Sequence, residues 1–153
     1  MNTEIITLPL SGVKRLQSRV AKRALPAILR ASIRPLWASN ISVSTVRRLT
    51  EGLLRYGLVP RAALISSTTL DGRACELITP ASGASEQVLF YVHGGGYVMC
   101  SPRTHRPLTS RLSLALSATT YVPSYRLAPE DPYPAGLNDV HQSYLALLKK
   151  GVS

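Results

Sequence analysis

Three consecutive glycines, Gly94 to Gly96, constrain the fold of this chain more than any other feature. They follow the run Val88 to Val92, which is apolar at every position and predicts a strand buried on both faces. They precede Ser101-Pro102, which is typical of a helix N-cap and first helical residue. Glycine lets a backbone approach a ligand closely and adopt conformations that other residues avoid. The pattern therefore predicts a strand, a tight loop able to aim N–H groups at an anion, and a helix.

The chain after the glycines continues this pattern. Apolar residues at four-residue spacing predict a helix of about four turns with an apolar stripe, and they are Leu108, Leu112 and Leu116. The stretch Thr119 to Pro123 then has strand character. A strand, glycine loop, helix and strand in succession are typical of a right-handed crossover between parallel neighbours. We therefore expect an α/β fold.

An antiparallel hairpin is predicted upstream of the glycines. Two extended runs, Ala63 to Leu70 and Arg73 to Thr79, flank the dipeptide Asp71-Gly72. This dipeptide favours a type I′ turn, whose twist matches that of paired strands. The hairpin should lead through the small, polar stretch Pro80 to Gln87 into the buried strand.

Further helices are predicted from apolar residues at helical spacing. Between Gly12 and Leu36 these are Val13, Leu16, Val20 and Ala24. A helix from about Ser44 to Gly57 should carry on one face Val46, Leu49, Leu53 and Tyr56. A final helix from Ala135 to about Lys150 should align Leu137, Val140, Tyr144 and Leu148.

The positive charge is concentrated at the N-terminus. The chain carries a net charge of +10, yet residues 1–50 hold nine lysines and arginines against the single acid Glu4. Such a segment could meet nucleic acid, an anionic membrane surface, or acidic patches elsewhere in the same protein. Trp37 is the only aromatic residue before Tyr56, so single-stranded nucleic acid is disfavoured. A similarity to organelle transit peptides and interfacial helices also stays open.

Neither a metal nor a cofactor is expected. Cys75 and Cys100 form no C-x-x-C pair and have no histidine at metal-ligand spacing. Two reduced thiols suit a cytoplasmic protein. The first twelve residues lack a signal-peptide pattern, and no run of 18 apolar residues occurs, so neither secretion nor membrane spanning is expected.

The glycine loop does not match a nucleotide-binding loop. No Gly-Lys-Ser/Thr follows it, and the spacing G-x-G-x-x-G is absent. Preceded by His93, it instead forms the H-G-G-G pattern that lipases and esterases place after a strand. In that position its N–H groups help to hold the oxyanion of a tetrahedral intermediate.

Three segments together resemble the hormone-sensitive-lipase family of α/β hydrolases. They are Phe90 to Tyr97, Ser101 to Arg106, and Tyr125 to Glu130, within a resemblance that covers Val59 to Lys150. The resemblance implies that residues 59–153 are the N-terminal, incomplete portion of the hydrolase domain. It also implies that residues 1–58 are a helical, basic, cap-like segment.

The resemblance also implies the roles of individual residues. The N–H groups of Gly94 and Gly95 would be the oxyanion donors, and Gly96 would permit the turn. His93 would be a framework residue of the motif. Arg126 and Glu130 would be tied into the framework by charge-assisted bonds, without a catalytic role.

The chain departs from the family in one respect. A serine acyl-enzyme mechanism needs a G-x-S-x-G elbow, then an acid, then a histidine, and no serine of the chain has both flanking glycines. We therefore expect nucleophile, acid and base after Ser153, and a 153-residue chain that is inactive or nearly so by itself. The expected function is hydrolysis of a small-molecule carboxylic ester by the complete enzyme. The alternatives are a non-catalytic interaction module or a relic, with self-association through an open sheet edge or weak contact with a membrane surface.

Overall fold

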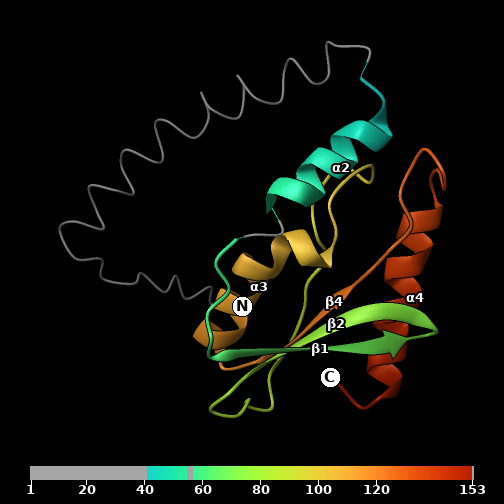
Figure 1. The fold of residues 1–153 in the computed structure, drawn as a ribbon. Helices are drawn as coiled ribbons and strands as arrows, with labels where there is room; N and C mark the ends of the chain where they lie inside the picture. The colour runs from blue at the N-terminus through green and yellow to red at the C-terminus, as the bar shows by residue number, and fades with distance from the viewer. Residues whose placement is uncertain (1–40, 55–56, 153) are drawn as a thin grey trace, which may run out of the picture. The chain divides into compact units, whose positions relative to one another are not determined.

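The computed structural model describes residues 41–54 and 57–152. The chain divides into two compact units, Met1–Ile41 and Ser42–Ser153, and only the second is described below. The helices predicted between Gly12 and Leu36 lie outside the described residues, as does Tyr56. The elements of the second unit are α2 (Val43–Leu54), β1 (Ala63–Leu70), β2 (Arg73–Pro80), β3 (Val88–Phe90), α3 (Pro102–Leu116), β4 (Thr119–Pro123) and α4 (Ala135–Lys149) (Figure 1).

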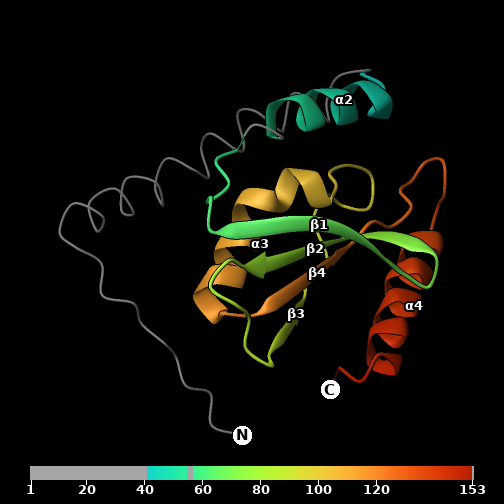
Figure 2. The same cartoon turned by 60° about the horizontal axis from the view of Figure 1, so that its bottom comes forward.

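The four strands form one mixed sheet in the order β1-β2-β4-β3 (Figure 2). The pairs β1·β2 and β2·β4 are antiparallel, whereas β3 and β4 are parallel and are connected through α3. The strand, loop, helix and strand predicted from the sequence are therefore present, and the α/β fold is confirmed. This arrangement places the glycine loop where β3 ends.

The hairpin forms as the Asp71-Gly72 dipeptide predicts. Leu70 lies opposite Arg73 in the antiparallel ladder, so the loop between the strands has two residues. Asp71 and Gly72 have φ values of 51° and 74°. Two successive positive φ values are what a type I′ turn requires. The turn thus fixes the register of β1 against β2.

The two faces of the sheet are covered by different helices. Ile78 and Val122 are fully buried on one face, where Leu114 of α3 packs against them. Cys75 lies three residues from Ile78 and therefore points to the other face, where it packs with Leu147 of α4. The core consequently consists of two small clusters, one under each helix.

The predicted leucine stripe of α3 does not face the sheet. Leu108 and Leu116 are about half exposed, and the fully buried residues of this helix are Thr109, Ser110 and Ser113. Small side chains let the helix backbone approach the sheet closely. Ser113 Oγ, for example, lies 3.4 Å from the carbonyl oxygen of Ile78 in β2.

The predicted stripes of α2 and α4 are also largely exposed. In α2 only Val46 is buried, while Leu49 and Leu53 are exposed. In α4 the apolar residues left exposed are Leu137, Tyr144 and Leu148. The buried face of α4 instead consists of Gly136, Asp139, Ser143 and Leu147.

The apolar strand is an edge strand and is not buried on both faces. β3 contains only Val88–Phe90, each residue is half buried, and Val92 beyond it is exposed. Within the described residues β3 pairs with β4 alone, so its other edge is unpaired. Phe90 packs against Tyr144 of α4, with ring centroids 5.8 Å apart. None of the described helices is long and apolar enough to cross a membrane.

One buried carboxylate ties α4 to the rest of the unit. Asp139 is 1% exposed and accepts hydrogen bonds from the backbone N–H, Nε and Nη2 of Arg126 at 2.8 to 3.0 Å. It also pairs with Nη2 of Arg73 at 2.6 Å. Burial by itself would raise the pKa of the Asp139 carboxyl, but the bonds from Arg126 and the charge of Arg73 outweigh it and hold this pKa below its ordinary value.

Replacing this carboxylate should destabilise the chain. We expect Asp139→Asn to lower the free energy of unfolding by about 2 to 3 kcal/mol, because two arginines lose their buried acceptor. The wild-type contribution should be present above the ordinary carboxyl pKa and be lost as pH falls through the depressed one. Urea unfolding of both proteins between pH 7 and pH 3 measures this.

A matched control is available on the same arginine. Asp131 lies 3.6 Å from Nη1 of Arg126 and its side chain is 41% exposed. Asp131→Asn should therefore change stability little. Equal effects of the two substitutions would contradict the role assigned to Asp139.

Candidate functional site

The loop after β3 has an unusual backbone. Gly95 and Gly96 have φ values of 129° and 62°, and the non-glycine residues Tyr97 and Cys100 have values of 61° and 69°. A left-handed conformation costs a non-glycine residue on the order of 1 kcal/mol. Because the strain is confined to a short segment, the surroundings must hold this segment in place.

Gly95 has a further steric requirement. A Cβ there would collide with the carbonyl oxygen of Met99 and lie 3.1 Å from Cβ of Cys100. At Gly94 a Cβ would meet only Nε2 of His105, at an ordinary 3.8 Å, and its φ is outside the left-handed region. The structure thus requires glycine at Gly95 but not, on steric grounds, at Gly94.

Most carbonyl groups of the loop are held by hydrogen bonds. The donors come from the loop itself, from the segment after β4, and from α2. The bonds are Tyr125 Oη to His93 O (2.6 Å), His93 Nδ1 to Gly94 O (2.9 Å), Val98 N and Met99 N to Gly95 O (3.1 Å each), Ala128 N to Tyr97 O (2.8 Å), and Arg47 Nε to Val98 O (3.0 Å).

The N–H groups of Gly94 and Gly95, unlike these carbonyl groups, make no hydrogen bond in the described part of the chain. Among the hydrogen bonds formed within the described part of the chain, none has either N–H as its donor. Gly94 is exposed and Gly95 is half buried. Adjacent backbone N–H groups that are not used within a protein can bind a negatively charged oxygen.

His93 is part of the framework under the loop. Its side chain is buried, and Nδ1 must carry a proton because its partner, the Gly94 carbonyl oxygen, can only accept. Burial lowers the pKa of the imidazole, against the opposing effect of the bond to Gly94. A neutral imidazole that holds a carbonyl group acts here on the loop conformation.

Tyr125 supports the loop through two contacts with His93. Its ring stacks on the His93 ring, with centroids 4.2 Å apart and planes inclined by 13°. Burial raises the pKa of the Tyr125 phenol to about 12, so the hydroxyl keeps the proton that it donates to His93 O. Gly136 allows this packing, because a Cβ there would lie 2.7 Å from Arg126 O and 3.3 Å from the Tyr125 ring.

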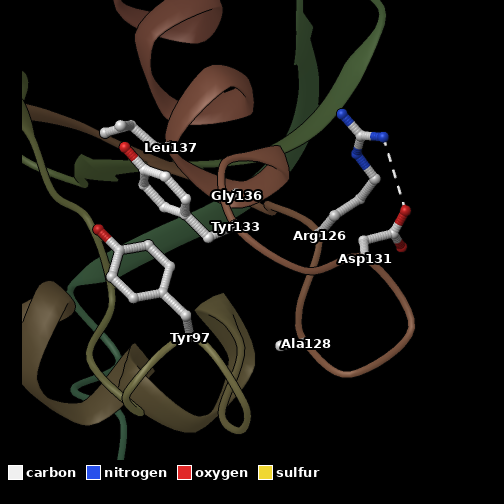
Figure 3. Close-up of a pocket in the computed structure, with 7 residues that line it drawn as sticks. All are labelled: Tyr97, Arg126, Ala128, Asp131, Tyr133, Gly136 and Leu137. Carbon is white, nitrogen blue, oxygen red and sulfur yellow. Dashed lines mark ion pairs between the residues drawn. The ribbon is translucent and has the colours of Figure 1, made fainter.

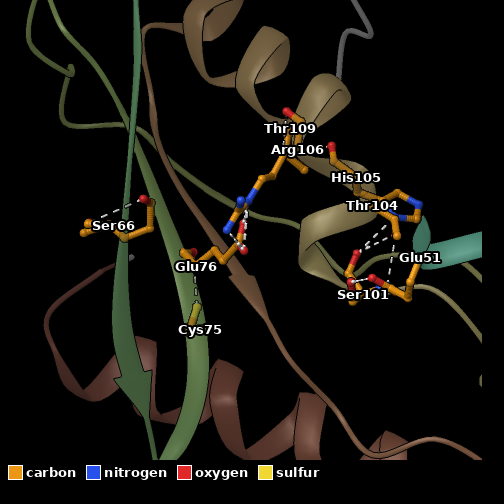
Figure 4. Close-up of polar contacts among 10 residues, drawn as sticks. Glu51, Ser66, Cys75, Glu76, Ser101, Thr104, His105, Arg106 and Thr109 are labelled. Carbon is orange, nitrogen blue, oxygen red and sulfur yellow. Dashed lines mark hydrogen bonds and ion pairs between the residues drawn. The ribbon is translucent and has the colours of Figure 1, made fainter. Parts of the chain in front are cut away.

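The far end of the loop is fixed by the start of α3 (Figure 4). Ser101 donates its backbone N–H to Oγ1 of Thr104 at 3.1 Å, which caps the helix. Its hydroxyl donates to Oε2 of Glu51 in α2 at 3.1 Å. Farther along α3, Arg106 pairs with Glu76 of β2 at 2.7 Å, which fixes the helix on the sheet.

A small hollow of about 190 Å³ begins at the loop residue Tyr97 (Figure 3). The rings of Tyr97 and Tyr133 and the side chain of Leu137 lie around it, with Arg126 and Asp131 farther along its rim. Complete ligand sites measure about 300 to 1,000 Å³. The hollow can therefore take only a small group.

Not every part of this site could be predicted from the sequence. Gly94 to Gly96 and His93 lie together as expected, and Arg126 and Glu130 are tied into the framework through Asp139 and Arg47. The roles of Tyr125 and Arg47 were missed. Tyr125 begins the third of the segments that resemble the family, Tyr125 to Glu130, so the sequence did single it out. No pattern in the sequence singled out Arg47. Within the described residues, no group of three or more His, Cys, Asp or Glu side chains could hold a metal ion.

Comparison with known proteins agrees with this geometry. A family profile described as the alpha/beta hydrolase fold matches residues 89–152. A crystal structure of a hormone-sensitive lipase from a metagenome library superposes with a TM-score of 0.71 and 36% identity, over 75% of this chain and 38% of that one. The chain has the α/β-hydrolase fold and is similar to the hormone-sensitive-lipase type of this fold.

Two relatives with curated sequences match most of this chain. LipR of Mycobacterium tuberculosis is 30% identical over 86% of this chain and 42% of its own length. An esterase of Acinetobacter venetianus is 30% identical over 82% of this chain and 41% of its own length. The chain thus spans about two fifths of the length of these two relatives.

Gly94 and Gly95 should respond differently to an added methyl group. We expect Gly95→Ala to lower the free energy of unfolding by about 2 kcal/mol or more, since it adds both a collision and a strained φ. Gly94→Ala should change it by less than about 1 kcal/mol. Thermal and urea unfolding measure the difference, and a Gly94 variant as unstable as the Gly95 variant would contradict the loop geometry.

Proposed function

We propose that this chain supplies the oxyanion-binding half of a carboxylic ester hydrolase. The observation that carries the proposal is the pair of N–H groups at Gly94 and Gly95 that donate no hydrogen bond in the described part of the chain, in a loop where the carbonyl oxygens of His93 and Gly94 are bound. Attack on an ester carbonyl moves negative charge onto its oxygen. Donors already aimed at that oxygen stabilise the transition state without reorganising.

The residues of the chain have distinct tasks in this mechanism. Gly94 and Gly95 donate their N–H groups to the developing oxyanion, and Gly96 allows the turn between them and Tyr97. His93 and Tyr125 keep the loop in place from below. The serine that attacks the carbonyl, with its acid and base, would follow in the chain order of this fold. Without them the oxyanion site gives at most weak catalysis.

The hollow beside Tyr97 supports a small-molecule ester as substrate. Its walls carry two phenol rings and one leucine, and its volume of about 190 Å³ suits a short apolar group. We therefore propose esters of short- or medium-chain carboxylic acids. The relatives named above agree in class, because one of them is named an esterase.

The test begins with the coding DNA after the Ser153 codon. All three forward frames are searched for G-x-S-x-G followed by aspartate and histidine codons. A protein that includes such a continuation should hydrolyse p-nitrophenyl butyrate, whereas the 153-residue chain should stay near background. In the longer protein Gly95→Ala should lower kcat by about a hundredfold.

Gly52→Ala is the control for this assay. Gly52 lies in α2, and a Cβ there would meet nothing within 4 Å. It should leave hydrolysis unchanged. A continuation without the motif in any frame, or a longer protein that does not hydrolyse esters, would overturn the proposal.

We also propose that the 153-residue chain associates with itself. The free edge of β3 and the exposed residues Tyr144 and Leu148 of α4 support this, because unpaired apolar edges bind other strands. Analytical ultracentrifugation should find oligomers at micromolar concentration. A monodisperse monomer with one cooperative unfolding transition would contradict it.

A second role would use the basic N-terminus. Nine lysines and arginines against one acid in residues 1–50 support weak contact with an anionic membrane surface, as in a non-catalytic interaction module. Salt-sensitive binding to phosphatidylserine vesicles that is lost when residues 1–41 are removed would favour this role. The free thiols of Cys75 and Cys100 support a cytoplasmic location.

A further inference from the structure

Arg47 of α2 makes four hydrogen bonds to segments that are 51 to 83 residues away in the chain. Nε donates to the carbonyl oxygen of Val98 at 3.0 Å, and Nη2 donates to that of Ala128 at 2.8 Å. Nη1 and Nη2 bind the two carboxylate oxygens of Glu130 at 3.0 and 2.9 Å. All three guanidinium nitrogens are therefore engaged at once.

These bonds join the two segments that shape the glycine loop. Val98 directly follows the strained Tyr97, and the amides of Val98 and Met99 close the turn on Gly95 O. Ala128 donates its own N–H to Tyr97 O at 2.8 Å. Arg47 thus binds the carbonyl oxygen of Ala128, and the N–H group of Ala128 in turn binds the loop at Tyr97 O.

The planar shape of the side chain matters as much as its charge. Glu130 is more than half exposed, so an ion pair with it alone would contribute little. The two carbonyl oxygens are bound by different nitrogens, Nε and Nη2, and a guanidinium group can bind both while it also pairs with the carboxylate. A lysine has one nitrogen and could satisfy only part of this set.

We infer that Arg47 is a positioning residue for the oxyanion site, through which helix α2 sets the conformation of the glycine loop. The inference deepens the proposed function and rests on it. Arg47 itself touches neither the N–H groups of Gly94 and Gly95 nor a reacting atom. It acts through Val98 and Ala128, and Glu51 adds a second contact from the same helix by accepting from Ser101 at the far end of the loop (Figure 4).

The test is hydrogen exchange of the 153-residue chain, followed by mass spectrometry of peptides from residues 93–100 and 126–131. Arg47→Ala should speed exchange of both peptides by about tenfold or more, because charged hydrogen bonds to two carbonyl groups are lost. The hairpin peptide from residues 63–80 should exchange at the wild-type rate. Arg47→Lys should exchange as fast as Arg47→Ala in the two loop peptides, since lysine keeps the positive charge but lacks the several nitrogens of the guanidinium group.

Arg48→Ala is the matched control, because Arg48 lies on the same helix and is exposed. It should leave all three peptides unchanged. The inference is overturned if Arg47→Ala leaves the two loop peptides at wild-type rates. It is equally overturned if the hairpin accelerates by the same factor, which would indicate general destabilisation, or if Arg47→Lys restores full protection.

A second experiment distinguishes failure of this inference from failure of the proposed function. In a longer protein that hydrolyses p-nitrophenyl butyrate, Arg47→Ala should lower kcat by at least about tenfold with KM little changed. An unchanged kcat would overturn the positioning role. If the wild-type protein does not hydrolyse esters but the exchange result holds, the proposed function fails while the control of the loop by α2 stands.

Discussion

The glycine loop depends on the binding of its carbonyl groups. A peptide unit whose oxygen is fixed by a hydrogen bond has its N–H direction fixed as well, because the unit is planar. The bonds to His93 O and Gly94 O therefore determine where the N–H groups of Gly94 and Gly95 point. In the described part of the chain these two oxygens are bound, whereas neither amide donates a hydrogen bond. The proposed oxyanion site depends on this difference.

The parts of the fold that were predicted correctly depend on short-range chemistry. Asp71-Gly72 determines a turn within four residues, and Ser101-Pro102 begins a helix within one turn. The glycine triplet belongs to the same class, because backbone sterics act locally. In each case the residues that decide the structure are neighbours in the chain. No knowledge of the remaining fold was needed.

The predicted buried faces of the helices differ from the observed ones, because apolar periodicity does not identify the face that meets a sheet. In α3 the small residues Thr109, Ser110 and Ser113 allow close approach, and the leucines remain on the outside. The prediction that the strand β3 is buried on both faces was wrong for a related reason. An apolar run is buried on both faces only if neighbours cover it, and β3 lies at an edge of the described sheet. Both errors concern neighbours that are distant in the sequence.

The role of Arg47 could not be predicted from a local sequence pattern. It lies on an exposed helix among other polar residues, and its partners become neighbours only when the segment after β4 folds back beside the glycine loop. The positive φ values of Tyr97 and Cys100 have the same origin, since no local preference favours them. A strained loop persists when contacts from several elements together exceed its cost. Here those contacts come from α2, α3 and the segment after β4, so the conformation of the glycine loop is a property of the whole unit rather than of the four residues His93 to Gly96.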